Sequence, residues 1–108
     1  MEKFEVYHSE RFDKELYKFD KRFQDRVDKI EDMLVENPYY GSPLGTPSFR
    51  EARFETYRIY YLVYHDLKAV YMVAISDKKD QQKVINTIKL FMDFFREEIE
   101  KIVKSKGS

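Results

Sequence analysis

The chain begins with a short stretch in which apolar and polar residues alternate, which is the period of a half-buried β-strand. This stretch covers residues 3–7, Lys-Phe-Glu-Val-Tyr. Ser9 then offers a helix N-cap, and Glu10 places an acid in the first turn, where the helix dipole favours negative charge. The pattern therefore predicts a strand that is followed directly by a helix.

Apolar residues then recur at spacings of three and four, which describes one buried stripe along helical structure. They are Phe12, Leu16, Phe19, Phe23, Val27, Ile30 and Leu34. The stripe fits one long helix or a hairpin of two, and we favour the hairpin because Asp20 can cap a second helix that begins near Lys21. Asn37-Pro38 ends the pattern, since proline disfavours helix in the residue before it. Residues 37–48 hold three Pro and two Gly and are expected to form a loop.

Three strands are predicted after this loop. Residues 49–55 alternate imperfectly, and residues 57–64 are rich in β-branched and aromatic side chains. Residues 65–68 suit a hairpin turn. Residues 69–75 are nearly all apolar, as expected for a central strand that is buried on both faces.

A long helix is predicted for residues 80–104, capped by Asp77 or Asp80 and extending about 38 Å at the usual rise per residue. Its apolar stripe comprises Val84, Ile88, Phe91, Met92, Phe95, Ile99 and Ile102. The whole order predicts an α+β fold, with a strand, a helical hairpin, a three-stranded antiparallel meander that completes a four-stranded sheet, and a long C-terminal helix. We expect residues 1–108 to form a single domain.

Composition narrows the function classes. The 108 residues suit one core, and the absence of cysteine excludes a disulfide scaffold and a thiol nucleophile. Lys and Arg total 20, as do Asp and Glu, so a diffuse polycation that coats nucleic acid is not expected. No apolar run approaches the roughly 20 residues of a membrane helix, and the first residues lack signal-peptide character, so a cytoplasmic protein is expected. His8 and His65 have no metal-ligand spacing, and we expect neither a metal nor a cofactor.

Several local strings, in this order, resemble the RelE/ParE superfamily of bacterial and archaeal toxins. The resemblance as a whole spans roughly residues 3–85. The strings are FDKELYK at 12–18, ENP at 36–38, GSPL at 41–44, FREAR at 49–53, YRIYY at 57–61 and DKKD at 77–80. The resemblance implies a toxin that is bound by a cognate antitoxin. Proteins of the RelE branch cut mRNA on the ribosome, whereas proteins of the ParE branch block DNA gyrase and cleave no RNA.

Arg58 is the residue that the resemblance matches to the transition-state arginine of the nuclease branch. It shares a strand face with Tyr60, Leu62 and Tyr64, and we expect this face to be open while the opposite face meets the helices. A guanidinium on an open face can grip a phosphate with two hydrogen bonds. The alternative is an ion pair with Glu51 or Glu55 on the neighbouring strand.

Other basic and aromatic residues complete the candidate RNA site. By the resemblance, Lys78 takes the place of a second phosphate-contacting residue, and Lys79 follows it. Arg50 and Arg53 lie on the strand where the nuclease branch has paired basic groups. Glu51 falls where a catalytic lysine would lie, so the identity of the general base stays open. Two loop tyrosines are candidates for stacking on unpaired bases. They are Tyr39 and Tyr40.

The last segment of the nuclease branch often carries a Tyr or His as acid or base, whereas residues 82–85 are Gln-Lys-Val-Ile here. We therefore expect weak or degenerate cleavage if the chain is a ribosome-associated mRNA endoribonuclease. The alternative is a non-enzymatic protein, either a ParE-like topoisomerase inhibitor or an inactive relative that binds its antitoxin. Whether the chain is an enzyme stays open.

The far end of the predicted long helix extends beyond what a small core can bury. An exposed apolar stripe there implies a partner, either the antitoxin or a second copy of the chain. The residues assigned to this contact are Phe94, Phe95, Ile99 and Ile102.

Overall fold

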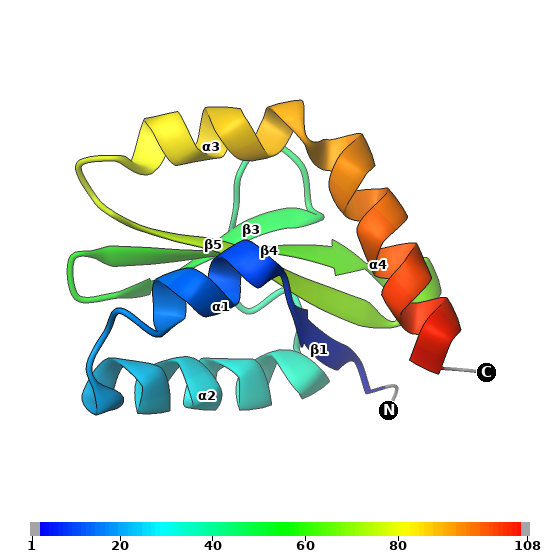
Figure 1. Cartoon of the computed structure of the whole chain (residues 1–108), viewed down its shortest axis with the longest axis horizontal. Coiled ribbons are helices and arrows are strands. Elements are labelled where there is room, and N and C mark those ends of the chain that lie inside the picture. The colour runs from blue at the N-terminus through cyan, green and yellow to red at the C-terminus, as the bar shows by residue number, and fades with distance from the viewer. Residues whose placement is uncertain (1–2, 107–108) are drawn as a thin grey trace.

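The computed structural model describes residues 3–106, so the two outermost residues at each end of the predicted domain lie outside the described residues. Along the chain, one strand is followed by two helices, then by the remaining four strands and finally by two more helices (Figure 1). The elements are β1 (Glu5–His8), α1 (Glu10–Leu16), α2 (Lys21–Glu36), β2 (Ser42–Pro43), β3 (Phe49–Phe54), β4 (Tyr57–Tyr64), the 3-10 turn η1 (His65–Leu67), β5 (Ala69–Asp77), α3 (Gln81–Leu90) and α4 (Met92–Lys106).

The strands form one mixed sheet in the order β1-β5-β4-β3-β2. β1 pairs parallel with β5, and the other neighbours pair antiparallel. The predicted meander is therefore confirmed, and a fifth strand adds to the four predicted. This strand, β2, lies in the predicted loop and pairs Ser42 and Pro43 with β3. A proline is tolerated there because a strand at the edge of a sheet can lack one of the backbone N–H groups that pair neighbouring strands.

The helical hairpin predicted from Asp20 is confirmed. The hydroxyl of Ser9 accepts a hydrogen bond from the Phe12 amide at 3.1 Å and caps α1. The Asp20 carboxylate accepts one from the Phe23 amide at 2.9 Å and caps α2. Each cap satisfies a backbone donor that a helix start leaves without an internal partner. The chain can therefore stop one helix and start the next within a few residues.

Both faces of the sheet are covered by helices (Figure 1). The predicted stripe of α1 and α2 packs against Ile59, Tyr61 and Val63, the face of β4 that we expected to meet the helices. The opposite face, with Tyr60 and Leu62, is covered by α3 and α4. The expectation of an open face was therefore wrong: both of these side chains are fully buried.

The helical segment after β5 follows the prediction in extent but is divided at Phe91 into α3 and α4. Phe91 leaves helical geometry, with φ −107° and ψ 18°. Figure 1 shows α4 turning downward from the end of α3, toward the β1 end of the sheet. The turn carries Phe95 and Ile99 back onto the sheet, where both are buried. A straight helix would instead have carried them past the edge of this core.

Ion pairs hold α4 in this position. Arg96 donates two hydrogen bonds to the Asp66 carboxylate, at 3.0 and 2.6 Å, and its guanidinium lies 5.5 Å from the centre of the Tyr64 ring. Near the end of α4, Lys106 contacts the Glu5 carboxylate at 2.6 Å. Bidentate pairing fixes direction as well as distance. Among the described residues, no helix is both long and apolar enough to cross a membrane.

Candidate functional site

A cluster of polar side chains lies on the α3 face of the sheet. The register pairs Glu51 with Tyr60, Arg53 with Arg58, and Arg58 with Ser76. Directly paired residues share a face, as do residues two apart on one strand. The three central strands therefore bring these side chains together beneath the first turn of α3, and we call Glu51, Arg53, Arg58, Tyr60 and Ser76, with Gln81 of α3, the polar cluster.

Glu51 is the acceptor at the centre of the polar cluster. It is 2% exposed. One carboxylate oxygen accepts a hydrogen bond from Arg53 Nε at 3.2 Å, and the other accepts one from the Gln81 side-chain amide at 2.8 Å. A buried carboxylate needs such donors because its desolvation is costly. Gln81, which the sequence did not suggest as a site residue, therefore ties the start of α3 to the sheet.

Arg58 lies beside Glu51 and is buried, with 6% of its surface exposed. Its Nη1 donates to the Tyr57 carbonyl at 3.2 Å, and its Nε is buried without a hydrogen-bond partner in the described part of the chain. The prediction that this guanidinium faces outward was therefore wrong. The reason is that α3 packs across the face on which Arg58 stands. Neither Glu51 nor Glu55 forms an ion pair with Arg58, so the predicted alternative was wrong too.

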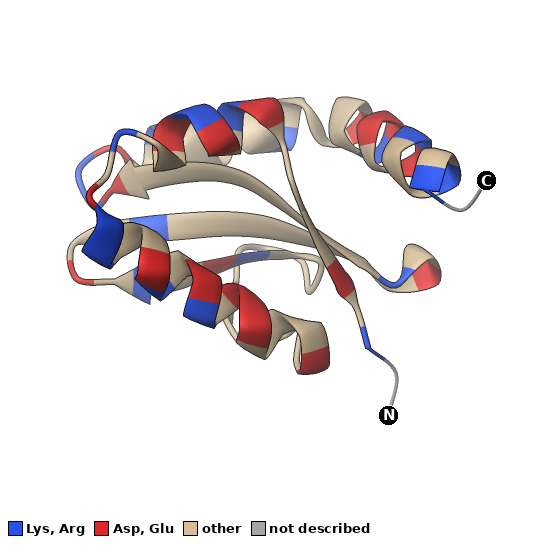
Figure 2. Cartoon of the chain, turned by 60° about the horizontal axis from the view of Figure 1, so that its bottom comes forward, with Lys and Arg blue, Asp and Glu red and all other residues tan. Residues whose placement is uncertain are grey.

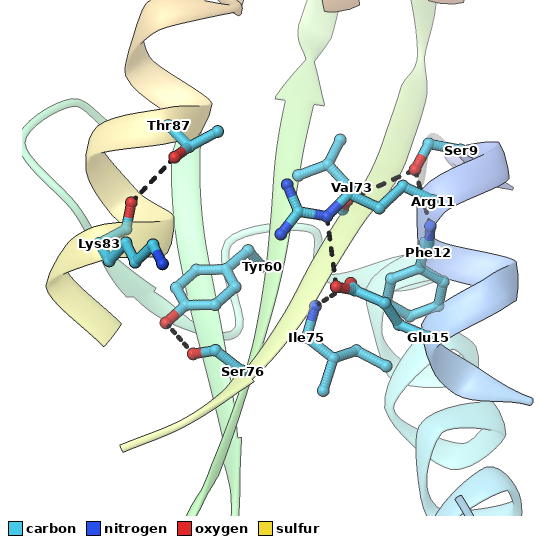
Figure 3. Close-up of polar contacts among 10 residues, drawn as sticks. All are labelled: Ser9, Arg11, Phe12, Glu15, Tyr60, Val73, Ile75, Ser76, Lys83 and Thr87. Atoms are coloured by element: carbon cyan, nitrogen blue, oxygen red, sulfur yellow. Dashed lines mark hydrogen bonds and ion pairs between the residues drawn. The ribbon is translucent and has the colours of Figure 1, made fainter. Parts of the chain in front are cut away.

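Tyr60 completes the buried part of the cluster (Figure 3). Its hydroxyl lies 2.8 Å from Ser76 Oγ, and Ser76 in turn donates to the Asp77 carbonyl at 2.9 Å. Because a serine hydroxyl has a single proton, this arrangement makes Tyr60 the donor and Ser76 the acceptor. Burial raises the pKa of Tyr60, and the hydrogen bond with Ser76 opposes that rise only in part. The phenol therefore stays protonated at neutral pH.

Arg50 stands on the other face of β3, in register with Tyr61. Its guanidinium donates to three loop carbonyls, those of Gly41 (3.0 and 2.7 Å), Pro47 (3.0 Å) and Tyr39 (3.0 Å). It also lies 5.3 Å from the centre of the Tyr39 ring. Its donors thus hold the loop against the sheet. The structure separates Arg50, Tyr39 and Tyr40 from Arg53 and Arg58, although the two tyrosines are exposed as stacking would require.

The remaining predicted basic residues lie in the turn between β5 and α3. Lys78 and Lys79 are exposed, and the Lys78 amide donates to the Thr56 carbonyl at 2.8 Å. That bond joins this turn to the β3–β4 turn, at the end of the sheet where Arg53 and Arg58 stand. Arg53 itself is 62% exposed. This end of the sheet therefore carries three accessible cations around a buried core of Glu51 and Arg58.

The charges elsewhere do not form a single basic surface. Figure 2 shows both signs interleaved along the helices. Among residues 3–106, no group of three or more His, Asp or Glu side chains is arranged to hold a metal ion. The arrangement can therefore bind a specific partner by matched charges, but it lacks the broad positive field that concentrates nucleic acid.

His8 has a role that its isolated place in the sequence did not reveal. Its Nδ1 lies 2.6 Å from Asp13 and its Nε2 lies 2.6 Å from Glu31. Burial disfavours charge on this imidazole, but the hydrogen bonds and negative charges of Glu31 and Asp13 outweigh burial and raise its pKa to about 9. The protonated ring therefore joins β1, α1 and α2. This pairing is structural and lies outside the polar cluster.

The family follows from a comparison with known sequences. The family described as "ParE toxin of type II toxin-antitoxin system, parDE" matches residues 6–82. This match covers most of the chain, which therefore belongs to the RelE/ParE-like toxins, as the resemblance implied. No curated protein matches the chain.

Solved structures share the fold. A mutant of the Escherichia coli toxin RelE in the free state is 18% identical, with a TM-score of 0.70 over 81% of this chain and 96% of that one. The RelBE2 toxin–antitoxin complex of Mycobacterium tuberculosis is 22% identical, with a TM-score of 0.62 over 69% and 98%. The intact RelBE complex of E. coli is 19% identical, with a TM-score of 0.62 over 68% and 95%. Because these structures share so few identical residues with the chain, their similarity establishes its fold alone.

Proposed function

We propose that this chain is the toxin of a toxin–antitoxin pair and that it acts by binding its target, as a ParE-like topoisomerase inhibitor, rather than by cleaving RNA. The observation that carries the proposal is the burial of Glu51 and Arg58, with 2% and 6% of their surfaces exposed. These are the residues best placed to supply a base and a charge-stabilising group. The match to the ParE description supports the same choice.

RNA cleavage through the 2′-hydroxyl needs three accessible functions. A base removes the hydroxyl proton, a cation stabilises charge on the phosphorus, and an acid protonates the leaving oxygen. Each group must come within hydrogen-bond reach of the substrate. Here both oxygens of Glu51 accept internal hydrogen bonds, and the Tyr60 proton is donated to Ser76. No group of the buried cluster is free to meet a polynucleotide while α3 stays in place.

An antitoxin is the partner that the proposal requires. Several structures with this fold hold a toxin together with its antitoxin. A toxin that acts by binding must be neutralised in the same compartment as its target, so the proposal places the chain in the cytoplasm with gyrase. The zero net charge agrees with a protein target, because such a chain gains little from general attraction to phosphates.

The experiment adds the purified chain to a gyrase supercoiling reaction and, in parallel, to a translating extract. We expect supercoiling to fall with increasing toxin, and we expect primer extension on the translated mRNA to show no new 5′ ends. The matched control is the toxin with its antitoxin added, which should restore supercoiling. Unchanged supercoiling together with toxin-dependent mRNA cleavage would overturn the proposal.

A ribosome-associated nuclease is the second candidate, and one observation favours it. Arg58 Nε is buried without a hydrogen-bond partner, and Arg53, Lys78 and Lys79 surround it at the surface. If the first turn of α3 moved away, these cations would form a phosphate site. This candidate requires mRNA cleavage that Arg58→Lys abolishes in a variant with unchanged circular dichroism. Retention of cleavage in that variant would exclude Arg58 from the chemistry.

A further inference from the structure

The residues predicted to contact a partner on the last helix do not form one exposed stripe. Phe95 and Ile99 are buried in the core of their own chain, and Ile102 packs against that core. Phe94 remains exposed at the surface. The predicted stripe is therefore largely internal, because the turn at Phe91 brings α4 back onto the sheet.

A charged pocket of about 300 Å³ opens between α2 and the end of β3, on the face of the sheet opposite α3 (Figure 1). We call it the α2 pocket. Three cations of α2 line it, namely Arg22, Arg26 and Lys29, together with Asp25 and the Phe54 ring of β3. Residues spaced by three and four lie on one face of a helix, so the helical period brings the three cations together. The pocket is separate from the polar cluster, which lies beneath α3.

Arg26 is the donor of the α2 pocket that lacks an acceptor. Its guanidinium lies 5.7 Å from the centre of the Phe54 ring. It forms no hydrogen bond and no ion pair within residues 3–106, and its Nε is buried without a partner. A buried N–H group that lacks an acceptor is costly. The donors of this guanidinium are therefore all left for an acceptor that enters the pocket.

The two other cations add positive charge that the chain compensates only in part. Arg22 lies 5.4 Å from the centre of the same ring and donates to the Glu55 carboxylate at 2.8 and 3.3 Å. The two side chains of this ion pair are 66% and 49% exposed, so water screens it. Lys29 is exposed and, in the described part of the chain, forms no ion pair. Because like charges one helical turn apart repel, a bound anion would stabilise this arrangement.

We propose that the α2 pocket binds a phosphate group. The planar guanidinium of Arg26 can donate to two phosphate oxygens at once, and the ammonium group of Lys29 can contact another as a point charge. A carboxylate fits less well, because its two oxygens lie in one plane and are both used by a single guanidinium. A phosphate has oxygens in more directions and can therefore satisfy both unpaired cations.

The phosphate can belong to a free nucleotide or to the backbone of a nucleic acid, and the pocket recognises the group that the two share. A single site of this kind does not need a broad positive field, so it is compatible with the zero net charge of the chain. The proposal goes beyond the proposed function, because neither inhibition of a topoisomerase nor cleavage of RNA enters it.

The test titrates the folded wild-type chain with inorganic phosphate at constant ionic strength and follows the arginine Nε–H signals by proton–nitrogen correlation NMR. We expect the Arg26 signal to shift as its Nε gains an acceptor, with saturation in roughly the millimolar range. The Nε–H signals of Arg50 and Arg96 should move little, because both groups already donate to acceptors of the chain. Acetate at the same ionic strength should shift the Arg26 signal much less.

Variants measure which side chains hold the phosphate, through the backbone amide signals of α2. Arg26→Gln should weaken phosphate binding at least about tenfold, because it removes the charged donor fork. Arg26→Lys keeps the charge but loses the fork and should bind about threefold more weakly than wild type. Asp25→Asn should tighten binding about threefold, since it removes a carboxylate that lines the pocket.

Lys29→Gln and Lys101→Gln form a matched pair. Lys101 is exposed on α4, forms no ion pair among the described residues and does not line the α2 pocket. Both variants lower the net charge by the same amount. Lys29→Gln should weaken phosphate binding about threefold, whereas Lys101→Gln should bind as wild type does.

Two further ligands identify the source of the phosphate. Adenosine monophosphate represents nucleotides, and a short oligothymidylate represents a nucleic-acid backbone. The ligand that binds more tightly, and that loses more affinity in Arg26→Gln, is assigned as the source. Either order supports a phosphate site.

Three results would overturn the proposal. One is an Arg26 Nε–H signal that phosphate leaves unmoved up to its solubility limit, which is a measurement on the wild-type chain and needs no variant to fold. Another is an equal response to acetate, which would show a general anion site. The third is an equal loss of affinity in Lys29→Gln and Lys101→Gln, which would show attraction to net charge alone. Unchanged circular dichroism confirms that each variant is folded.

Discussion

Glu51→Ala is expected to lower the free energy of unfolding by about 2 kcal/mol. Removing the carboxylate leaves the Gln81 side-chain amide without its acceptor and takes away the ion-pair partner of Arg53. A partly buried donor that loses its acceptor is more costly than a lost surface contact. Urea unfolding followed by circular dichroism gives the value.

Glu100→Ala is the matched control for this change. Glu100 also contacts an arginine, at 2.7 Å, but it is half exposed on the surface of α4. Its removal should cost about 0.5 kcal/mol or less. If both variants lose the same small amount of stability, the polar cluster does not hold α3 on the sheet, and our description of it is wrong.

The second large effect is a dependence of stability on pH that comes from His8. Because its pKa in the folded chain is raised from 6.5 to about 9, the protonated form is stabilised by folding. This stabilisation is fully present below pH 6.5 and is lost as the pH rises through 9. The shift corresponds to about 3 kcal/mol, which we reduce to about 2 kcal/mol because Asp13 is half exposed.

His8→Gln separates this contribution from the titration of Tyr and Lys at high pH. At pH 6 the variant should be less stable than wild type by about 2 kcal/mol, because it lacks the charge between Asp13 and Glu31. The two stability curves should approach each other between pH 6.5 and 9.5. A constant difference across this range would contradict a raised pKa for His8.

Much of the fold could be predicted because its signals are local. Asp20 caps α2 through its own side chain, and the alternation along β4 places Ile59, Tyr61 and Val63 on one face wherever the strand lies. The caps and the apolar stripe depend on residues within a few positions of one another. The parallel pairing of β1 with β5 is different, since it joins segments that are more than 60 residues apart.

The environment of Arg58 could not be predicted from its neighbours in sequence. An arginine within an apolar strand suggests an open face, yet what covers that face is α3, which begins 23 residues later. The composition of Tyr57–Tyr64 is nevertheless a signal of burial: all but one of its residues are apolar or aromatic, which is typical of a strand covered on both faces. Gln81 had no local signal, because its role exists only once α3 lies over Glu51.

The division of the last helix also depends on tertiary packing. Neither glycine nor proline occurs near Phe91, so the sequence contains no breaker. The continuous stripe from Val84 to Ile102 fits a straight helix equally well. The turn at Phe91 lets Phe95 and Ile99 reach the sheet, and the ion pair between Arg96 and Asp66 holds α4 there. The exposed aromatic side chains at the junction are a consequence of this turn.

The central claim, that Arg58 lies closed beneath α3, is tested most directly by arginine modification of the native chain. Phenylglyoxal is added to folded protein, and adducts are located by peptide mass spectrometry. Arg53 and Arg22, which are 62% and 66% exposed, should react while Arg58 stays unmodified until the chain is unfolded in urea. Modification of Arg58 in the folded protein at the rate of Arg53 would contradict the account and would favour an open phosphate site at this end of the sheet.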